Sequence, residues 1–219
     1  MIKPYYEEPG ITIYCADCRD VLPQLEPVDL VLTDPPYGIG VDLAMHKKSG
    51  SQYGKSAAPA GKYEYSNWDK CAPENALIEN IIDMGKKTIL WGGNYFYLPP
   101  ARCILVWDKQ TDNGNNCFTD CELAWTNLDK PIRIKHHMWN GMLRKNNEPR
   151  YGHPTQKPLE IIKWCIFISG TTGTILDPFM GSGTTLRAAK DLGRRAIGIE
   201  IEQKYCDIAI ERLRQGVLL

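Results

Sequence analysis

The stretch TDPPYG, Thr33 to Gly38, brings together a carboxylate, two consecutive prolines and an aromatic ring. It directly follows a short apolar run, Val28 to Leu32, that is typical of a buried strand. The prolines fix two φ angles and remove two backbone donors, so the chain here is rigid and does not continue as a helix. Asp34 and Tyr37 are therefore held stiffly at a strand end. Taken alone, the stretch also fits a rigid turn whose tyrosine packs into the core.

A second strand end carries a glycine turn, in TILDPFMGSGTT, Thr174 to Thr185. Gly181 and Gly183 allow a tight turn and a close approach of the backbone to a ligand. Another apolar run follows and ends in Glu200, where a doubly wound fold binds ribose hydroxyls. The pattern predicts a nucleotide site. The carboxylate of Asp177 favours a nucleoside with a cationic tail, such as S-adenosylmethionine, over the pyrophosphate of NAD, which stays the alternative.

The motif HPTQKP, His153 to Pro158, leads into a predicted helix. Proline is typical of the first helical turn, so a simple helix start is one interpretation of this motif. Because the glycine turn predicts a cofactor nearby, we expect Thr155 to line its amino-acid end and Lys157 to pair with its carboxylate.

Predicted strands and helices alternate along the chain, which indicates an α/β sheet covered by helices on both faces. One domain over residues 1–219 is expected from the length. The predicted strands are Ile11–Cys15, Val28–Thr33, Thr88–Trp91, Cys103–Trp107, Glu122–Thr126, Ile132–Lys135, Thr174–Asp177 and Arg195–Glu200. The predicted helices are Pro73–Met84, Pro158–Ser169, Thr184–Leu192 and Glu202–Arg214.

The composition is that of an ordinary globular protein with a net charge of zero. A wholly basic nucleic-acid coat protein is excluded, whereas a local basic face is not. The sequence has no apolar run long enough to span a membrane and no signal peptide at MIKPYYEEPG, so we expect a cytoplasmic protein. Among eight cysteines, a CxxC and a CxxxC pair could bind zinc, but reduced, mostly buried thiols and no metal are the preferred interpretation.

Two segments do not fit the alternation of strands and helices. Residues 39–68 are rich in Gly, Ser, Lys and Ala without an apolar period, which predicts a long loop of functional importance. Residues 130–151 are polar, turn-rich and basic, and Glu148 is the only acidic residue within this segment. A solvated surface is the simpler interpretation of each segment in isolation.

Together, TDPPYG, ILDPFMGSGTT, HPTQKP and AIGIEIEQKYCDIAIERL closely resemble the amino-methylating DNA methyltransferases, which methylate adenine N6 or cytosine N4. The DPPY element precedes the glycine turn, an order similar to that of the permuted β-group of this family. The resemblance covers nearly the whole chain. It implies a Rossmann-like methyltransferase fold, mostly parallel and doubly wound, with S-adenosylmethionine as the methyl donor.

The resemblance also implies roles for individual residues. The catalytic element is formed by Asp34, Pro35, Pro36 and Tyr37. The cofactor site is expected to comprise Asp17, His153, Thr155, Lys157, Asp177, Phe179, Gly181, Ser182, Gly183, Thr184 and Glu200. Asn94, in WGGNYF, is expected to border the pocket, while ELAWT and VWDK resemble structural strands of the family.

The implied substrate is double-stranded DNA, whose target base must leave the stack before its amine is accessible. The loop 39–68 starts at the catalytic element, and the basic segment 130–151 is the expected target-recognition element. Phosphate contacts are expected from Lys47, Lys48, Lys55, Arg133, Arg144, Lys145 and Arg150. Because the recognition segment is small, either the DNA site is short or a homodimer partner supplies part of the reading.

Within this family adenine N6 is favoured over cytosine N4, because the cytosine enzymes more often carry serine where this chain has Asp34. Three other functions stay open from sequence alone. They are a catalytically idle binding subunit, an RNA-directed methyltransferase of the same fold, and a dehydrogenase that binds NAD at the glycine turn.

Overall fold

The computed structural model describes residues 2–40, 70–110, 119–140, 143–144, 148–149, 151 and 155–216. Its main feature is a nine-stranded sheet in the order β1-β2-β11-β10-β3-β4-β6-β5-β7. The strands are β1 (Tyr6–Glu8), β2 (Ile11–Cys15), β3 (Val28–Thr33), β4 (Gly85–Trp91), β5 (Ile104–Asp108), β6 (Cys121–Thr126), β7 (Arg133–His136), β10 (Thr174–Asp177) and β11 (Arg195–Glu200). A separate antiparallel pair consists of β8 (Trp139–Asn140) and β9 (Leu143–Arg144).

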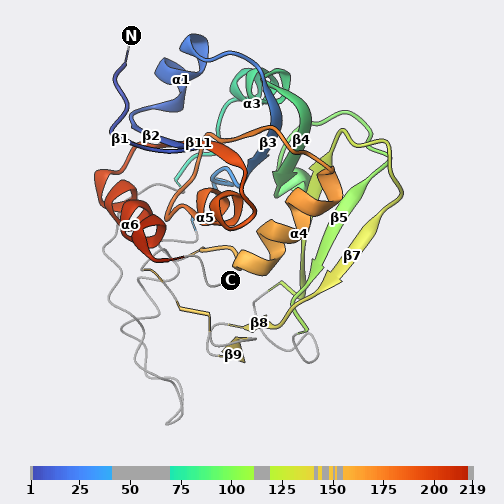
Figure 1. The fold of residues 1–219 in the computed structure, drawn as a ribbon. Helices are drawn as coiled ribbons and strands as arrows, with labels where there is room; N and C mark the ends of the chain where they lie inside the picture. Colours follow the sequence, from blue (N-terminus) through green and yellow to red (C-terminus); the bar gives the residue numbers. More distant parts are fainter. Residues whose placement is uncertain are drawn as a thin grey trace.

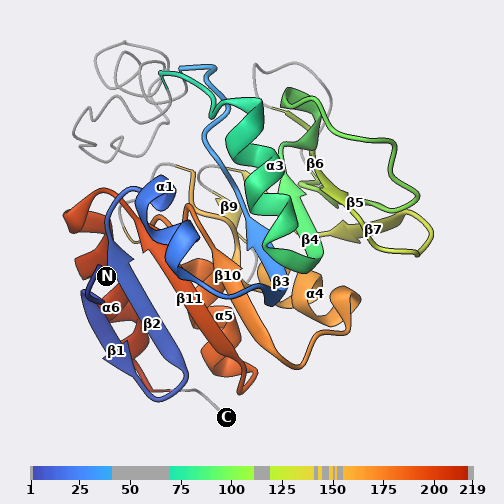
Figure 2. The same ribbon diagram turned by 90° about the horizontal axis from the view of Figure 1, so that it is seen from above.

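Helices cover both faces of the sheet (Figures 1 and 2). One face carries α1 (Cys18–Val21) and α3 (Asn75–Asp83), and the other carries α4 (Leu159–Ser169), α5 (Thr184–Asp191) and α6 (Gln203–Arg214). Two short 3₁₀ turns, η1 (Leu22–Gln24) and η2 (Gly93–Tyr95), complete the described elements. None of the helices in the described ranges is both long and apolar enough to cross a bilayer.

The apolar pattern of the central strands explains this layering. Successive side chains of a strand point to opposite faces, so a strand covered on both faces is apolar throughout. In β3, Leu30 and Leu32 are fully buried in the core beneath α4, α5 and α6, whereas Val31 is buried beneath α1 and α3. The apolar residues that predicted a buried strand, Val28, Leu30, Val31 and Leu32, are thus divided between two cores.

The strand order reverses direction between β10 and β3. From β10 the chain passes through α5 to β11 on one side, and from β3 it passes through α3 to β4 on the other. β10 and β3 are parallel neighbours, with Ile175 opposite Leu30 and Leu176 opposite Val31. The carboxyl ends of two such strands form the crevice in which open α/β sheets bind ligands. Both predicted motifs, TDPPYG and DPFMGSG, begin at this crevice.

The predicted Rossmann-like α/β fold with permuted motif order is confirmed. The first motif strand, β3, precedes β10 in the chain by more than one hundred residues, yet the two strands pair. The sheet is mixed, because β6 runs antiparallel between β4 and β5 and β1 runs antiparallel to β2.

Candidate active site

The two motif strands are joined by a direct side-chain contact. Thr33, the last residue of β3, donates a buried hydrogen bond of 2.7 Å from Oγ1 to Oδ1 of Asp177, the last residue of β10. The next residue after Thr33 is Asp34. The predicted catalytic carboxylate and the predicted cofactor carboxylate therefore follow adjacent strand ends.

Both oxygens of Asp34 are engaged in the structure. Its Oδ1 accepts a hydrogen bond from the Tyr37 hydroxyl, and its Oδ2 accepts one from the Lys157 ammonium. Burial raises the pKa of Asp34, and the neighbouring Lys157 opposes that shift. The structure brings Lys157 to the catalytic element, and its predicted role at the methionine end of the cofactor stays a prediction.

Lys157 is the buried member of a series of alternating charges that the sequence did not reveal, and its other members, Asp34, Glu122 and Lys109, are half-buried. Its ammonium lies 3.0 Å from Oε2 of Glu122, and Lys109 lies 2.6 Å from the other oxygen, Oε1. Burial alone would raise the pKa of Glu122, but the two ammonium groups outweigh it, so this pKa is lowered. Burial alone would lower the pKa of Lys157, but Asp34 and Glu122 outweigh it, so this pKa is raised.

The ring of Tyr37 lies in an aromatic corner. It stacks on Tyr95 with ring centroids 4.6 Å apart and planes at 15°, and Phe96 meets it edge-on. Gly92, at φ +70°, makes the close approach feasible, because a Cβ at this position would lie 2.1 Å from the tyrosine ring. Tyr95 is 41% exposed, so this corner presents an aromatic surface to solvent. A nucleobase could stack there.

The glycine turn after β10 holds two carboxylates. Asp177 accepts the Phe179 amide at 3.2 Å as well as the Thr33 hydroxyl, and burial raises its pKa to about 6. Glu200 accepts the amides of Gly181 at 3.0 Å and Glu202 at 2.8 Å, and burial raises its pKa to about 7. Among the described residues, neither carboxylate forms an ion pair.

Two desolvated carboxylates without a cation suit a ligand that brings hydroxyl donors and a positive charge. S-adenosylmethionine has both, so the residues fit the predicted cofactor. Glu200 would hold the ribose hydroxyls, and Asp177 lies closest to the catalytic element. Ile201, which is 63% exposed next to Glu200, adds an apolar surface that the sequence had not singled out.

The side chains of Ser182 and Thr184 face a buried arginine. Arg212 of α6 donates to the Ser182 carbonyl at 2.6 Å and to the Thr184 hydroxyl at 3.0 Å, and its guanidinium lies 4.3 Å from the centroid of the Tyr151 ring. This contact braces the turn from beneath. The cofactor-binding roles of both residues, in which Ser182 and Thr184 would act through the backbone, stay predictions.

Asp17 caps α1 at the end of β2. Its carboxylate accepts the Arg19 amide at 2.9 Å and pairs with the Arg19 guanidinium at 2.5 Å, which lowers the pKa of Asp17. The strand carrying Asp17 is the neighbour of the strand that ends in Glu200, as a role at the adenine side requires. That role also stays a prediction, as do those of Thr155, which is half-buried, and Asn94, which is exposed.

Several predicted residues lie outside the part of the chain that the structure describes. They are Lys47, Lys48, Lys55, Lys145, Arg150 and His153, and for Arg144 only the backbone of β9 is described. Most of the loop 39–68 also falls there. Arg133 is described and lies exposed on the edge strand β7.

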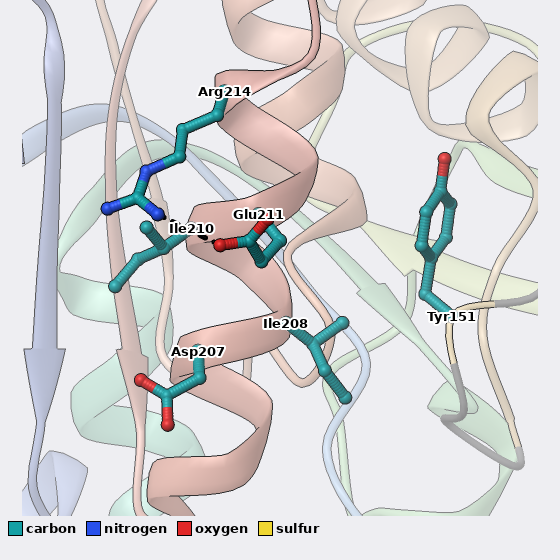
Figure 3. Close-up of a pocket in the computed structure, with 6 residues that line it drawn as sticks. All are labelled: Tyr151, Asp207, Ile208, Ile210, Glu211 and Arg214. Atoms are coloured by element: carbon teal, nitrogen blue, oxygen red, sulfur yellow. Dashed lines mark hydrogen bonds and ion pairs between the residues drawn. The ribbon is translucent and has the colours of Figure 1, made fainter.

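A shallow hollow of about 440 Å³ lies on the outside of α6 (Figure 3). It is lined by Tyr151, Asp207, Ile208, Ile210, Glu211 and Arg214. Because α6 packs over β2 and β11, this hollow is separate from the Asp34 site at the end of β3.

Comparison with known proteins points to the DNA methyltransferases, the family that the sequence motifs resemble. Residues 106–211 match the family model described as DNA methylase. The Type II methyltransferase M.HinfI of Haemophilus influenzae is 49% identical over 93% of this chain and 68% of its own length. M2.LlaDCHI of Lactococcus lactis subsp. cremoris is 29% identical over 99% of this chain and 94% of its own.

Two solved structures share the fold. The crystal structure of M1.HpyAVI aligns with a TM-score of 0.57 at 21% identity, over 94% of this chain and 100% of that one. The PvuII cytosine-N4-specific DNA methyltransferase aligns with a TM-score of 0.61 at 13% identity, over 99% and 91%.

The likeness to M.HinfI is close enough to establish the family as well as the fold. S-adenosylmethionine as methyl donor and DNA as substrate, both expected from the sequence, follow from that family. The chain belongs to the family of amino-methylating DNA methyltransferases, which act on adenine N6 or cytosine N4.

Proposed function

We propose that this enzyme methylates the N6 amine of an adenine that has been flipped out of double-stranded DNA. The observation that carries the proposal is the position of Asp34 directly after Thr33, whose hydroxyl is bonded to Asp177 of the cofactor turn. A hydrogen-bond acceptor for the amine thus lies beside the expected position of the methyl donor.

The chemistry requires such an acceptor. The exocyclic amine is a poor nucleophile because its lone pair is delocalised into the ring, and positive charge develops on nitrogen as it attacks. The Asp34 carboxylate accepts one N–H and stabilises that charge, while the Pro35 carbonyl accepts the other N–H. The rigid Pro35-Pro36 backbone fixes both acceptors before the base arrives. The cofactor would supply a methyl group on a positively charged sulfur, which would leave as a neutral thioether, and the methylated nitrogen would then release one N–H proton to water.

Tyr37 provides the surface on which the extruded base stacks, an interaction of about 1–3 kcal/mol. Its hydroxyl donates a hydrogen bond to Oδ1 of Asp34, so the amine takes the place of this hydroxyl when the base enters. Tyr95 covers one face of the Tyr37 ring and adds its own exposed ring to the aromatic surface.

The choice of adenine rests on Asp34 at the first position of the motif. Cytosine N4 is the second candidate, because the same two acceptors suit either amine. PvuII methyltransferase, a fold neighbour, is cytosine-N4-specific, but at 13% identity this likeness concerns the fold alone. The proposal of adenine over cytosine therefore rests on this aspartate.

The protein acts as a single catalytic domain that contacts DNA through residues 39–68 and 130–151. Because the recognition segment 130–151 is small, a homodimer partner contributes part of the sequence recognition. Methyl-labelled cofactor incubated with duplex DNA, single-stranded DNA and RNA tests the substrate class. We expect label in the duplex; label confined to RNA would contradict the proposal.

A further inference from the structure

Glu122 has no part in the amine chemistry, yet a single residue, Lys157, bridges it to the catalytic carboxylate of Asp34. Glu122 is the second residue of the antiparallel strand β6. Ala124, two positions further along and therefore on the same face of the strand, is a fully buried core residue. The Glu122 carboxylate contacts Lys157 at 3.0 Å and Lys109 at 2.6 Å. The register of β5 and β6 sets Glu122 opposite Trp107, next to Lys109, so two strands fix its position.

Lys157 is the link between Glu122 and Asp34. Its side chain is only 8% exposed, and its ammonium lies 5.7 Å from the centre of the Trp91 ring and 6.0 Å from that of Tyr37. Aromatic faces therefore border the ammonium where carboxylates do not. A buried ammonium in such surroundings requires anionic partners, and the described residues that pair with it are Asp34 and Glu122.

The two carboxylate oxygens of Asp34 have different partners, and this difference matters for the reaction. Lys157 holds Oδ2, so Oδ1, on which the Tyr37 hydroxyl lies, is the oxygen left for the incoming amine. Without Glu122, the full charge of Lys157 would be balanced by Asp34 alone. The ammonium would then weaken Asp34 as an acceptor and repel the positive charge that develops on the amine.

We infer that Glu122 is a positioning residue that acts through Lys157, keeping Asp34 oriented and negatively charged toward the base. The inference rests on the proposed role of Asp34 in methyl transfer. Stability alone does not account for the arrangement, since burying an ion pair is often no better than apolar packing of the same volume.

The test compares Glu122→Gln with Glu211→Gln, which removes an equally charged residue from the exposed face of α6. The measurements are kcat with saturating labelled cofactor and duplex DNA, KM for DNA, and Kd for the cofactor by calorimetry without DNA. We expect E122Q to lower kcat about tenfold to a hundredfold, as misplacement of a reacting group does. Its cofactor Kd should stay within about twofold of wild type, and E211Q should match wild type in all three measurements.

Two more variants separate positioning from folding. Glu122→Asp restores the carboxylate on a shorter side chain and should give a kcat between those of E122Q and wild type. Lys157→Met removes the link, so adding E122Q to it should lower kcat no further. This double variant also replaces the buried pair with neutral groups, which keeps the test available if E122Q alone does not fold.

Wild-type kcat in E122Q, equal slowness of E122D and E122Q, or losses that multiply in the double variant would overturn the inference alone. A loss confined to KM or to cofactor affinity would do the same. A wild-type protein that labels no DNA would overturn the proposed function and the inference together.

Discussion

Thr33 and Asp177, 144 positions apart in the chain, are joined by a buried hydrogen bond of 2.7 Å between their side chains. This bond connects the strand that delivers the catalytic carboxylate to the strand that delivers the cofactor turn. The permuted order of the motifs is therefore immaterial to the site, because sheet pairing restores their contact.

Replacing Thr33 with valine should destabilise this junction. Valine has the shape of threonine but donates nothing, so buried Asp177 loses a partner at a cost of about 1–3 kcal/mol. Urea denaturation of Thr33→Val measures the loss in free energy of unfolding. Thr12→Val, in half-buried surroundings on β2, is the matched control and should change this free energy by less. Equal stability of T33V and wild type would show that the bond contributes nothing.

The kcat of variants at Asp34 should depend on the hydrogen-bond acceptor that remains at this position. Alanine removes the acceptor and should abolish transfer, whereas asparagine keeps one carbonyl acceptor without the charge. Loss of one such electrostatic contact costs about 10²–10³ in kcat, so we expect wild type to exceed Asp34→Asn and Asp34→Asn to exceed Asp34→Ala. Single-turnover labelling of DNA measures the rates, and calorimetry should show cofactor binding largely intact. Unchanged turnover in D34A would refute the mechanism.

At Tyr37, the ring and the hydroxyl should have separate effects. Tyr37→Phe keeps the stacking surface and frees Oδ1 of Asp34, so its kcat/KM for DNA should stay within several-fold of wild type. Tyr37→Ala loses the stacking, worth about 1–3 kcal/mol. Steady-state kinetics on one duplex compares them. If the phenylalanine variant is the slower one, the hydroxyl and not the ring carries the function.

Cofactor affinity should fall as the pH falls through about 7, the raised pKa of Glu200 in the free protein. Ribose hydroxyls that donate to this carboxylate favour its ionised form, so binding lowers the pKa and releases a proton near neutral pH. Calorimetry between pH 6 and 8.5 in buffers of different ionisation enthalpy measures both effects. Glu200→Gln should bind more weakly and lose this part of the pH dependence. Tighter binding at pH 6 than at pH 8 would reverse the sign and contradict the role of Glu200.

The central elements were predictable because each carries its own local pattern. The strands β2, β3, β10 and β11 have the predicted bounds, since each contains closely spaced apolar residues and ends at a turn or bend. β4 starts earlier than predicted, at Gly85, because backbone pairing with β3 extends into the polar Gly-Lys-Lys start of the strand. β1, with the polar sequence Tyr-Glu-Glu, was missed because it has no apolar pattern and is defined by its pairing with β2.

The site was predictable only as far as the motifs reach. Asp34 and Tyr37 are three positions apart in sequence and are hydrogen-bonded in the fold, but Glu122 was assigned to a structural strand. The available signal was a single acid beside the apolar residues of ELAWT, and nothing local links it to Lys157, 35 positions away. Arg212, beneath the glycine turn, was likewise indistinguishable from the exposed Arg214 two positions along α6. Long-range pairing of buried charges is a property of the fold, which one sequence does not disclose.

The identity of the methylated base tests the central claim most directly. Duplex DNA is incubated with the enzyme and methyl-labelled S-adenosylmethionine, digested to nucleosides and separated by chromatography with mass detection. We predict label on N6-methyladenine that is absent with Asp34→Ala. Label on N4-methylcytosine would contradict the choice of base, and absence of label from all DNA would contradict the proposed function itself.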